Sequence, residues 1–334
     1  MEENCKVIFI AGNGRSGSTL LDTALGQMEG FFSGGEMCLV WQRYLDREWL
    51  CGCGSVLAQC EVWYQAMRSA YGSQPGRACL RMISIYREWR RLRYSCVLGY
   101  GAAVNRLEDF RCGIAALYEA LRQVTGCRVI VDSSKSVAYG RLLQGIAGVE
   151  LYPVHLVRDP RAVCYSRQRK KPLKLAPGAS PRYLNVVSVA RAARNWSRVV
   201  LLNQLAWRRP KGAVRVRYED FVAKPEATLQ TIAKLAGEPA AAVRIQNGNR
   251  IRLRATHTAG GNPARFTTGD VVLRADDEWR DRMGFLDRMI VSVTCAPFAW
   301  LMDYPLFATR SNPRLDAVRA GDPVDRGAVN TLHH

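Results

Sequence analysis

Apolar positions along the chain form short runs that alternate with segments of helical spacing. Four runs are rich in β-branched and aromatic residues and predict buried strands at residues 7–11, 128–132, 152–158 and 214–218. Each run leads through a turn into a segment whose apolar residues recur every three or four positions, which predicts a helix. This alternation favours an α/β fold, with a parallel β-sheet flanked by helices on both faces.

The longest stretch between predicted core strands, residues 37–125, is mostly helical. Apolar spacing predicts helices at residues 37–49, 63–71, 78–98 and 103–125, and a shorter one at about 19–28. We interpret residues 37–125 as a helical insert in a single domain that spans residues 1–307. From residue 308 onward Arg, Asp, Gly and Pro predominate, which predicts a flexible tail at residues 308–334.

Length and composition fit one large α/β domain with a substantial core. The chain has 334 residues, of which 48% are hydrophobic. No apolar run approaches the roughly 20 residues needed to cross a bilayer, and the N-terminus enters the first strand without the pattern of a signal peptide. We therefore expect a cytoplasmic protein with no membrane span. The odd number of cysteines, 11, favours reduced thiols.

The charge balance points to anionic ligands. The formal net charge is +19, and most of the 48 basic residues are arginines. Nucleic acid, an acidic surface and a multiply phosphorylated nucleotide all fit such a charge, which does not rank them.

The first predicted strand leads into a glycine-rich turn and a helix start. Gly12, Gly14 and Gly17 allow a tight turn, and Thr19 with Asp22 fits a capping box at the start of the helix. Backbone N–H groups and the helix dipole favour an anion at such a turn. The turn is therefore a candidate cradle for a phosphate or a sulfate.

Two nucleotide-binding motifs compete for this turn. Residues 12–17 match G-x-G-x-x-G, with Glu36 at about the distance at which an acid holds a ribose. Residues 12–19 match the P-loop, except that Ser18 stands in place of its lysine. In phosphoryl transfer that lysine and Mg²⁺ neutralise the β- and γ-phosphates. A sulfonate carries less charge, so a turn rich in hydroxyls with one cation at Arg15 suits a phosphosulfate.

A second basic turn follows the predicted strand at residues 152–158. Asp159 can cap the next helix, with Pro160 in its first position. Seven residues separate Asp159 from Ser166, two helical turns, so the Ser166 hydroxyl returns to the strand end and can bind one anion together with Arg158. A helix cap with a surface ion pair is the alternative interpretation. A nicotinamide or flavin site does not need this second turn, which counts against the dinucleotide motif.

Together these motifs resemble those of sulfotransferases that use 3′-phosphoadenosine-5′-phosphosulfate (PAPS). The segment Gly14-Arg15-Ser16-Gly17-Ser18-Thr19-Leu20-Leu21 resembles the loop that binds the 5′-phosphosulfate in that family. The resemblance covers about residues 7–270 and implies a fold like that of P-loop NTPases. It implies that Arg158 and Ser166 bind the 3′-phosphate and that a late loop, residues 257–266, closes over the nucleotide. The cofactor-binding residues are thus expected to be Gly14, Arg15, Ser16, Gly17, Ser18, Thr19, Arg158, Ser166, Asn262 and Arg265.

The same resemblance implies catalytic roles. Glu36 lies at the spacing of the catalytic acid in the tyrosylprotein-sulfotransferase-like branch, and we expect a bacterial member of it in which Glu36 takes the proton of the acceptor hydroxyl. Lys135 would neutralise the bridging oxygen as the S–O bond breaks, and Arg15 would share that charge. The alternative interpretations are that Glu36 caps the next helix and that Lys135 is a surface lysine.

Cys51, Cys53 and Cys60 form a cluster in the sequence. Only three thiols lie nearby, their spacing is not C-x₂-C and no histidine follows within reach along the chain, which argues against zinc. We therefore expect buried thiols that pack the loop before Trp63, and no metal.

These observations predict a metal-independent enzyme that moves the sulfonate of PAPS, in line, to a hydroxyl of a small-molecule acceptor, phenolic, alcohol or glycosidic. The insert at residues 37–125 would form the acceptor side. Its aromatic residues could line a pocket or form core, and they are Trp41, Tyr44, Trp49, Trp63, Tyr64 and Trp89. A P-loop kinase or NTPase and a basic nucleic-acid-binding protein are the alternatives. The sulfotransferase interpretation implies no nucleic-acid partner.

Overall fold

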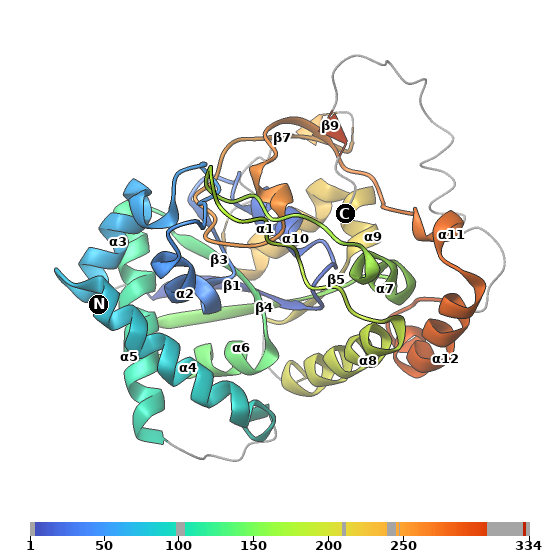
Figure 1. Ribbon diagram of the computed structural model, residues 1–334, viewed down its shortest axis with the longest axis horizontal. Coiled ribbons are helices and arrows are strands. Elements are labelled where there is room, and N and C mark those ends of the chain that lie inside the picture. Colours follow the sequence, from blue (N-terminus) through green and yellow to red (C-terminus); the bar gives the residue numbers. More distant parts are fainter. Residues whose placement is uncertain are drawn as a thin grey trace.

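A five-stranded parallel sheet of order β2-β3-β1-β4-β5 forms the centre of the chain (Figure 1). The computed structural model describes residues 4–97, 104–208, 212–238, 245–246, 248–305 and 330–331. The strands are β1 (Cys5–Gly12), β2 (Phe31–Gly35), β3 (Val129–Lys135), β4 (Val149–Val157) and β5 (Val214–Arg217). Every pairing in this sheet is parallel. The predicted α/β fold class and its four core strands are confirmed, and the extended run after the first helix is a fifth strand.

The two faces of β1 are buried in different cores, which explains its uninterrupted apolar sequence. Val7 and Phe9 belong to the core formed with the helices of the insert. Ile8 and Ile10 belong to the core formed with α1 (Ser18–Leu25) and α10 (Pro225–Leu235). Side chains of a strand alternate between faces, so a strand covered by helices on both sides needs apolar residues at every position.

The insert between β2 and β3 is helical, as predicted, but its first helix is shorter. The expected helix at residues 37–49 divides into a 3-10 turn, Met37–Leu39, and α2 (Val40–Leu45). Asp46, extended, ends it. The remaining helices of the insert are α3 (Glu61–Tyr71), α4 (Pro75–Val97) and α5 (Val104–Thr125). Figure 1 shows α4 and α5 together with α6 (Val137–Leu143) on one side of the sheet.

The other helices come after β3 in the chain. They are α6 (Val137–Leu143), α7 (Pro160–Gln168), α8 (Val189–Ala206), α9 (Tyr218–Ala223), α11 (Trp279–Arg282) and α12 (Phe285–Leu301). Asp159 caps α7 by accepting a hydrogen bond from the backbone N–H of Arg161, and Pro160 takes the first helical position, as predicted. No helix of the described residues is long and apolar enough to cross a membrane.

A second, four-stranded sheet of order β6-β7-β8-β9 was not expected from the sequence. Its strands are β6 (Ile245–Gln246), β7 (Arg250–Leu253), β8 (Gly269–Val272) and β9 (Asn330–Thr331). Runs of two to four residues are too short to give a reliable hydrophobic period. The predicted tail at residues 308–334 lies outside the described residues, except for the backbone of β9, which pairs with β8.

Candidate functional site

The carboxyl ends of β1, β2 and β3 meet at a cavity of about 260 Å³, the edge where parallel sheets bind their ligands. Most of the predicted site residues line it, namely Gly14, Arg15, Gly17, Ser18, Thr19, Glu36, Lys135, Ser166 and Asn262. Three predicted residues, Ser16, Arg158 and Arg265, are buried and do not line it.

The turn after β1 depends on glycine. Gly17 has a φ of 84°, and a Cβ there would lie 2.4 Å from the Cδ2 atom of Tyr218. Gly17 is also the N-cap of α1, without a side-chain cap hydrogen bond. The predicted capping box of Thr19 and Asp22 is therefore wrong, because the N-cap of α1 lies two residues before Thr19 and the carboxylate of Asp22 is engaged elsewhere.

Asp22 joins three elements beneath the turn. Its carboxylate accepts hydrogen bonds from the hydroxyls of Ser33 on β2, at 2.7 Å, and Ser133 on β3, at 2.6 Å. Asp22 is fully buried, and this burial raises the pKa of its carboxyl to about 7 although both hydroxyls oppose the shift. The strand that precedes Glu36 and the strand that ends at Lys135 are thus fixed to α1, the helix after the glycine-rich turn.

Replacing Asp22 by Asn should stabilise the protein more at pH 8 than at pH 5. The folded protein keeps a proton on Asp22 that the unfolded chain loses at about pH 4, so stability falls as the pH rises from about 4 to 7. Asn does not titrate, so it removes this fall and raises the free energy of unfolding by at most about 4 kcal/mol above pH 7. Urea unfolding of both proteins at the two pH values measures the difference, and an equal gain at pH 5 and pH 8 would contradict the assignment.

Several polar groups near the turn are buried without a protein partner. They are both terminal guanidinium nitrogens of Arg15 and the hydroxyls of Ser16 and Ser166. Burial and the nearby cations of Arg167 and Arg169 lower the pKa of Arg15 to about 10. Buried polar groups normally have hydrogen-bond partners, so this set of donors fits an anionic ligand.

The backbone is strained at two of the proposed catalytic residues. Arg15 has a φ of 76° and Lys135 a φ of 65°, in the left-handed region that residues other than glycine seldom adopt. Among the described residues other than glycine, only Asp303 also has a positive φ. Strain of this kind costs on the order of 1–3 kcal/mol and concentrates at functional sites.

Glu36, Lys135 and Arg43 form a compact charged group in the cavity wall. The Nζ atom of Lys135 lies 2.5 Å from one carboxylate oxygen of Glu36, and the guanidinium of Arg43 contacts the other. Burial opposes ionisation of Glu36, but the Lys135 and Arg43 cations prevail and hold the pKa of its carboxyl well below the usual range. Lys135 is thus not a surface lysine, and Glu36, the N-cap of the 3-10 turn, makes no side-chain cap hydrogen bond.

Arg158 lies behind the turn after β1 rather than beside Ser166 in the cavity wall. Its guanidinium donates to the backbone oxygens of Arg15, at 3.1 Å, and Asp276, at 2.9 Å. It also pairs with the Asp276 carboxylate at 3.3 Å and stacks on the ring of Tyr218. These contacts hold the turn after β1 in place. A contact between Arg158 and a phosphate stays a prediction.

The late loop closes the cavity on the other side. The backbone N–H of Asn262 donates to the Thr19 hydroxyl at 3.0 Å, which ties the loop to α1. Arg265 donates inward to the backbone oxygens of Gly261 and Leu50, and burial together with the Arg43 cation lowers its pKa to about 9. Asn262 therefore faces the cavity, whereas Arg265 is placed to support the loop.

A sulfotransferase family model matches residues 7–242, most of the chain. The chain belongs to the sulfotransferase family. Two solved structures share its fold over 91% of this chain, each with a TM-score of 0.50. One is the sulfotransferase domain from the Synechococcus PCC 7002 olefin synthase, 19% identical with 97% of that chain covered. The other is the sulfotransferase domain from the Curacin biosynthetic pathway, 16% identical with 99% covered. Among curated proteins, none matches.

The sulfotransferase site includes residues that sequence reasoning missed. Arg43, which pairs with Glu36, and Arg167, which lines the cavity beside Ser166, are cationic groups of the site. Arg43 could have been found from its spacing, because it stands seven residues, about two helical turns, after Glu36. Arg167 comes directly after Ser166 in the sequence, and this adjacency was a usable signal for it.

The aromatic residues of the insert are mostly core. Trp49 lines the cavity, and the Arg43 guanidinium stacks on its ring, 4.6 Å from the centroid. Tyr64 is exposed. The remaining four belong to the hydrophobic core, and they are Trp41, Tyr44, Trp63 and Trp89.

Proposed function

We propose that this sulfotransferase takes its sulfonate from PAPS and transfers it to a hydroxyl of a small acceptor. The observation that carries the proposal is the set of buried, unpartnered donors on two separate elements. Arg15 and Ser16 belong to the turn after β1, and Ser166 belongs to α7. PAPS carries two anionic groups at opposite ends of one ribose, and it would satisfy both elements at once.

The residues of the cavity divide the chemistry among them. Bound here, PAPS would supply a sulfonate on a phosphate leaving group. Glu36 accepts the proton of the acceptor hydroxyl, while the oxygen of that hydroxyl forms a bond to sulfur. Lys135 and Arg15 stabilise the negative charge on the bridging oxygen, which keeps the electron pair of the broken S–O bond. Ser166 and Arg167 hold the 3′-phosphate.

The donor set favours this chemistry over that of a kinase. Among the described residues that line the cavity, Glu36 is the one acid, and two cations already engage it. Mg²⁺ sites for nucleotide phosphates use free carboxylates or hydroxyls beside a P-loop lysine. A larger thermal shift with Mg²⁺ and ATP than with PAPS would favour the kinase instead.

The cavity wall is partly apolar. Leu173, Leu184 and Trp49 line it together with Asn185. An apolar wall with few polar groups suits a small organic molecule that presents one hydroxyl. We therefore propose a phenolic, alcohol or glycosidic acceptor.

Ser166→Ala should weaken binding of adenosine 3′,5′-bisphosphate by about 10- to 100-fold, the value of a hydrogen bond to a charged group. The same variant should bind adenosine 5′-monophosphate as the unaltered protein does, because that ligand lacks the 3′-phosphate. Isothermal titration calorimetry measures both constants. Equal weakening for the two ligands would remove Ser166 from the 3′-phosphate site, and no binding of the bisphosphate to the folded, unaltered protein would refute PAPS as donor.

A further inference from the structure

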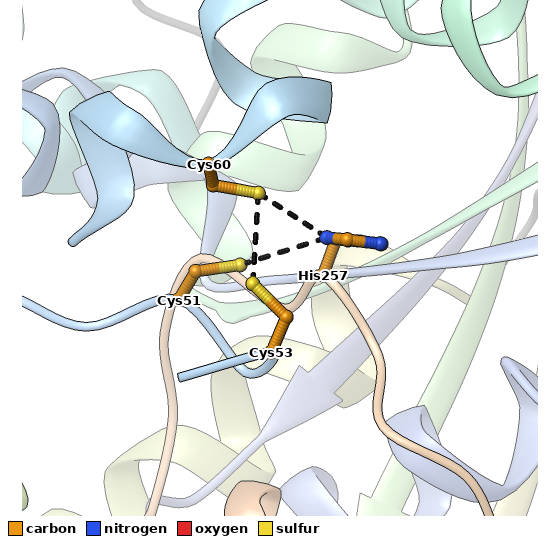
Figure 2. Close-up of side chains that lie close together, drawn as sticks. All are labelled: Cys51, Cys53, Cys60 and His257. Atoms are coloured by element: carbon orange, nitrogen blue, oxygen red, sulfur yellow. Dashed lines mark hydrogen bonds between the residues drawn. The ribbon is translucent and has the colours of Figure 1, made fainter. Parts of the chain in front are cut away.

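Four potential metal ligands meet outside the cavity just described. Figure 2 shows the side chains of Cys51, Cys53 and Cys60 directed toward the ring of His257, whose Nδ1 atom faces the sulfurs. We expected no zinc because we assumed that no histidine could reach the thiols. That assumption is wrong, because the late loop brings His257, 197 residues beyond Cys60, into the cluster.

The spacing of the four ligand atoms suits one tetrahedral ion. All lie within 4.8 Å of one another. The Cys53 and Cys60 sulfurs are 3.8 Å apart, and Nδ1 of His257 lies 3.2 Å from the Cys60 sulfur and 4.0 Å from the Cys51 sulfur. Zinc bonds of about 2.3 Å to sulfur and about 2.0 Å to nitrogen place sulfurs about 3.8 Å apart and nitrogen about 3.5 Å from sulfur in a tetrahedron.

The backbone around the cluster is shaped to present sulfur atoms. Cys51 and Cys53 lie on a tight turn in which the N–H of Gly54, at a φ of 95°, donates to the Cys51 oxygen at 2.9 Å. Backbone N–H groups of Cys53 and Trp63 are hydrogen-bonded to the sulfurs of Cys51 and Cys60. Such hydrogen bonds orient thiolate ligands and are a regular part of metal sites.

We propose that Cys51, Cys53, Cys60 and His257 bind one Zn²⁺ ion in a closed, tetrahedral structural site. Three soft thiolates and one imidazole in tetrahedral arrangement favour zinc over Mg²⁺ or Ca²⁺, which prefer oxygen ligands. With four protein ligands the ion has no position for a substrate, so the site is structural rather than catalytic. The proposal is independent of the donor and the acceptor.

The zinc site would join the helical insert to the late loop that borders the cavity. Beside His257, the indole N–H of Trp63 donates to the His257 oxygen at 2.6 Å. Two residues further on, the indole N–H of Trp49 donates to the Ala259 oxygen at 2.8 Å. The loop then reaches Asn262 in the cavity wall. Fixing this loop against the insert holds the two walls of the sulfotransferase cavity together.

Metal analysis of the purified full chain tests the proposal. Protein expressed in zinc-supplemented medium and isolated without chelators should contain close to one zinc ion per chain by inductively coupled plasma mass spectrometry. Cys53→Ser and His257→Ala should lose most of it. His257→Cys, which supplies a fourth thiolate, should retain it. Cys112→Ser, an exposed cysteine on α5, is the matched control and should keep the full zinc content.

A spectroscopic measurement decides the case if a variant folds poorly. The full, unaltered chain depleted of metal and supplied with Co²⁺ should show the intense visible bands of tetrahedral Co²⁺ with thiolate charge-transfer absorption, and Zn²⁺ should remove them. Folded protein without zinc and without these bands would overturn the proposal. Retention of zinc by His257→Ala, or a disulfide between Cys53 and Cys60 in protein as isolated, would overturn it as well.

Discussion

Replacing Glu36 by Gln should lower kcat by about 10²- to 10⁴-fold, the usual contribution of a general base. Gln keeps the size of the side chain but cannot take the proton of the acceptor hydroxyl. Removal of a negative charge beside Lys135 and Arg43 should leave the affinity for adenosine 3′,5′-bisphosphate unchanged or make it tighter. Steady-state kinetics and calorimetry on the same preparation measure the two effects. Glu61→Gln, an exposed acid at the start of α3, is the control and should retain full activity.

The ion pairs of Glu36 add a pH dependence to this prediction. In the free enzyme the pKa of Glu36 lies well below the usual range, so kcat/KM should show no loss of this base down to about pH 5. When the donor engages Lys135, Glu36 loses one of its cations and its pKa should rise, because fewer positive charges then stabilise the carboxylate. The acid limb of the kcat profile should therefore lie at higher pH than that of kcat/KM. Full activity of Glu36→Gln would assign the proton transfer to another group.

The fold was largely predictable because its central strands are buried on both faces. Residues 7–11 are apolar at every position, and a parallel sheet covered on both faces favours that pattern. The turn, cap and proline at Asp159 and Pro160 likewise act locally, so sequence alone placed the start of α7. The second sheet was not predicted because its strands, of two to four residues, are too short to show a hydrophobic period of their own.

Side chains of the candidate site were predictable where the strand order sets their position. They were not predictable where a contact with a distant segment sets it. Arg15, Glu36 and Lys135 follow neighbouring parallel strands, so their meeting at one edge follows from the strand order. The position of Arg158 depends on Asp276, more than a hundred residues later, whose carboxylate draws the guanidinium behind the turn. No local pattern contains that contact. The same holds for His257, which joins the cysteine cluster only through the path of the late loop.

Replacing Lys135 by Met should lower kcat by about 10²- to 10³-fold, the loss that follows removal of one preorganised group at a developing negative charge. Met keeps the length of the side chain but cannot neutralise the bridging oxygen. The fold should persist, because Glu36 keeps Arg43 as its partner. Lys170→Met is the matched control, since Lys170 is exposed, stacks on Tyr183 and does not line the cavity, and it should leave kcat unchanged.

Two readouts separate a role at the bridging oxygen from a merely structural one. A role at the bridging oxygen predicts that the loss of kcat persists on the plateau above the acid limb, where Glu36 is ionised in both proteins. The variant should also raise the pKa of Glu36, because burial then acts against one cation instead of two, and the acid limb of kcat/KM should move to higher pH. Full recovery of kcat on that plateau would make Lys135 a support for Glu36 and leave Arg15 as the cation that stabilises the leaving group.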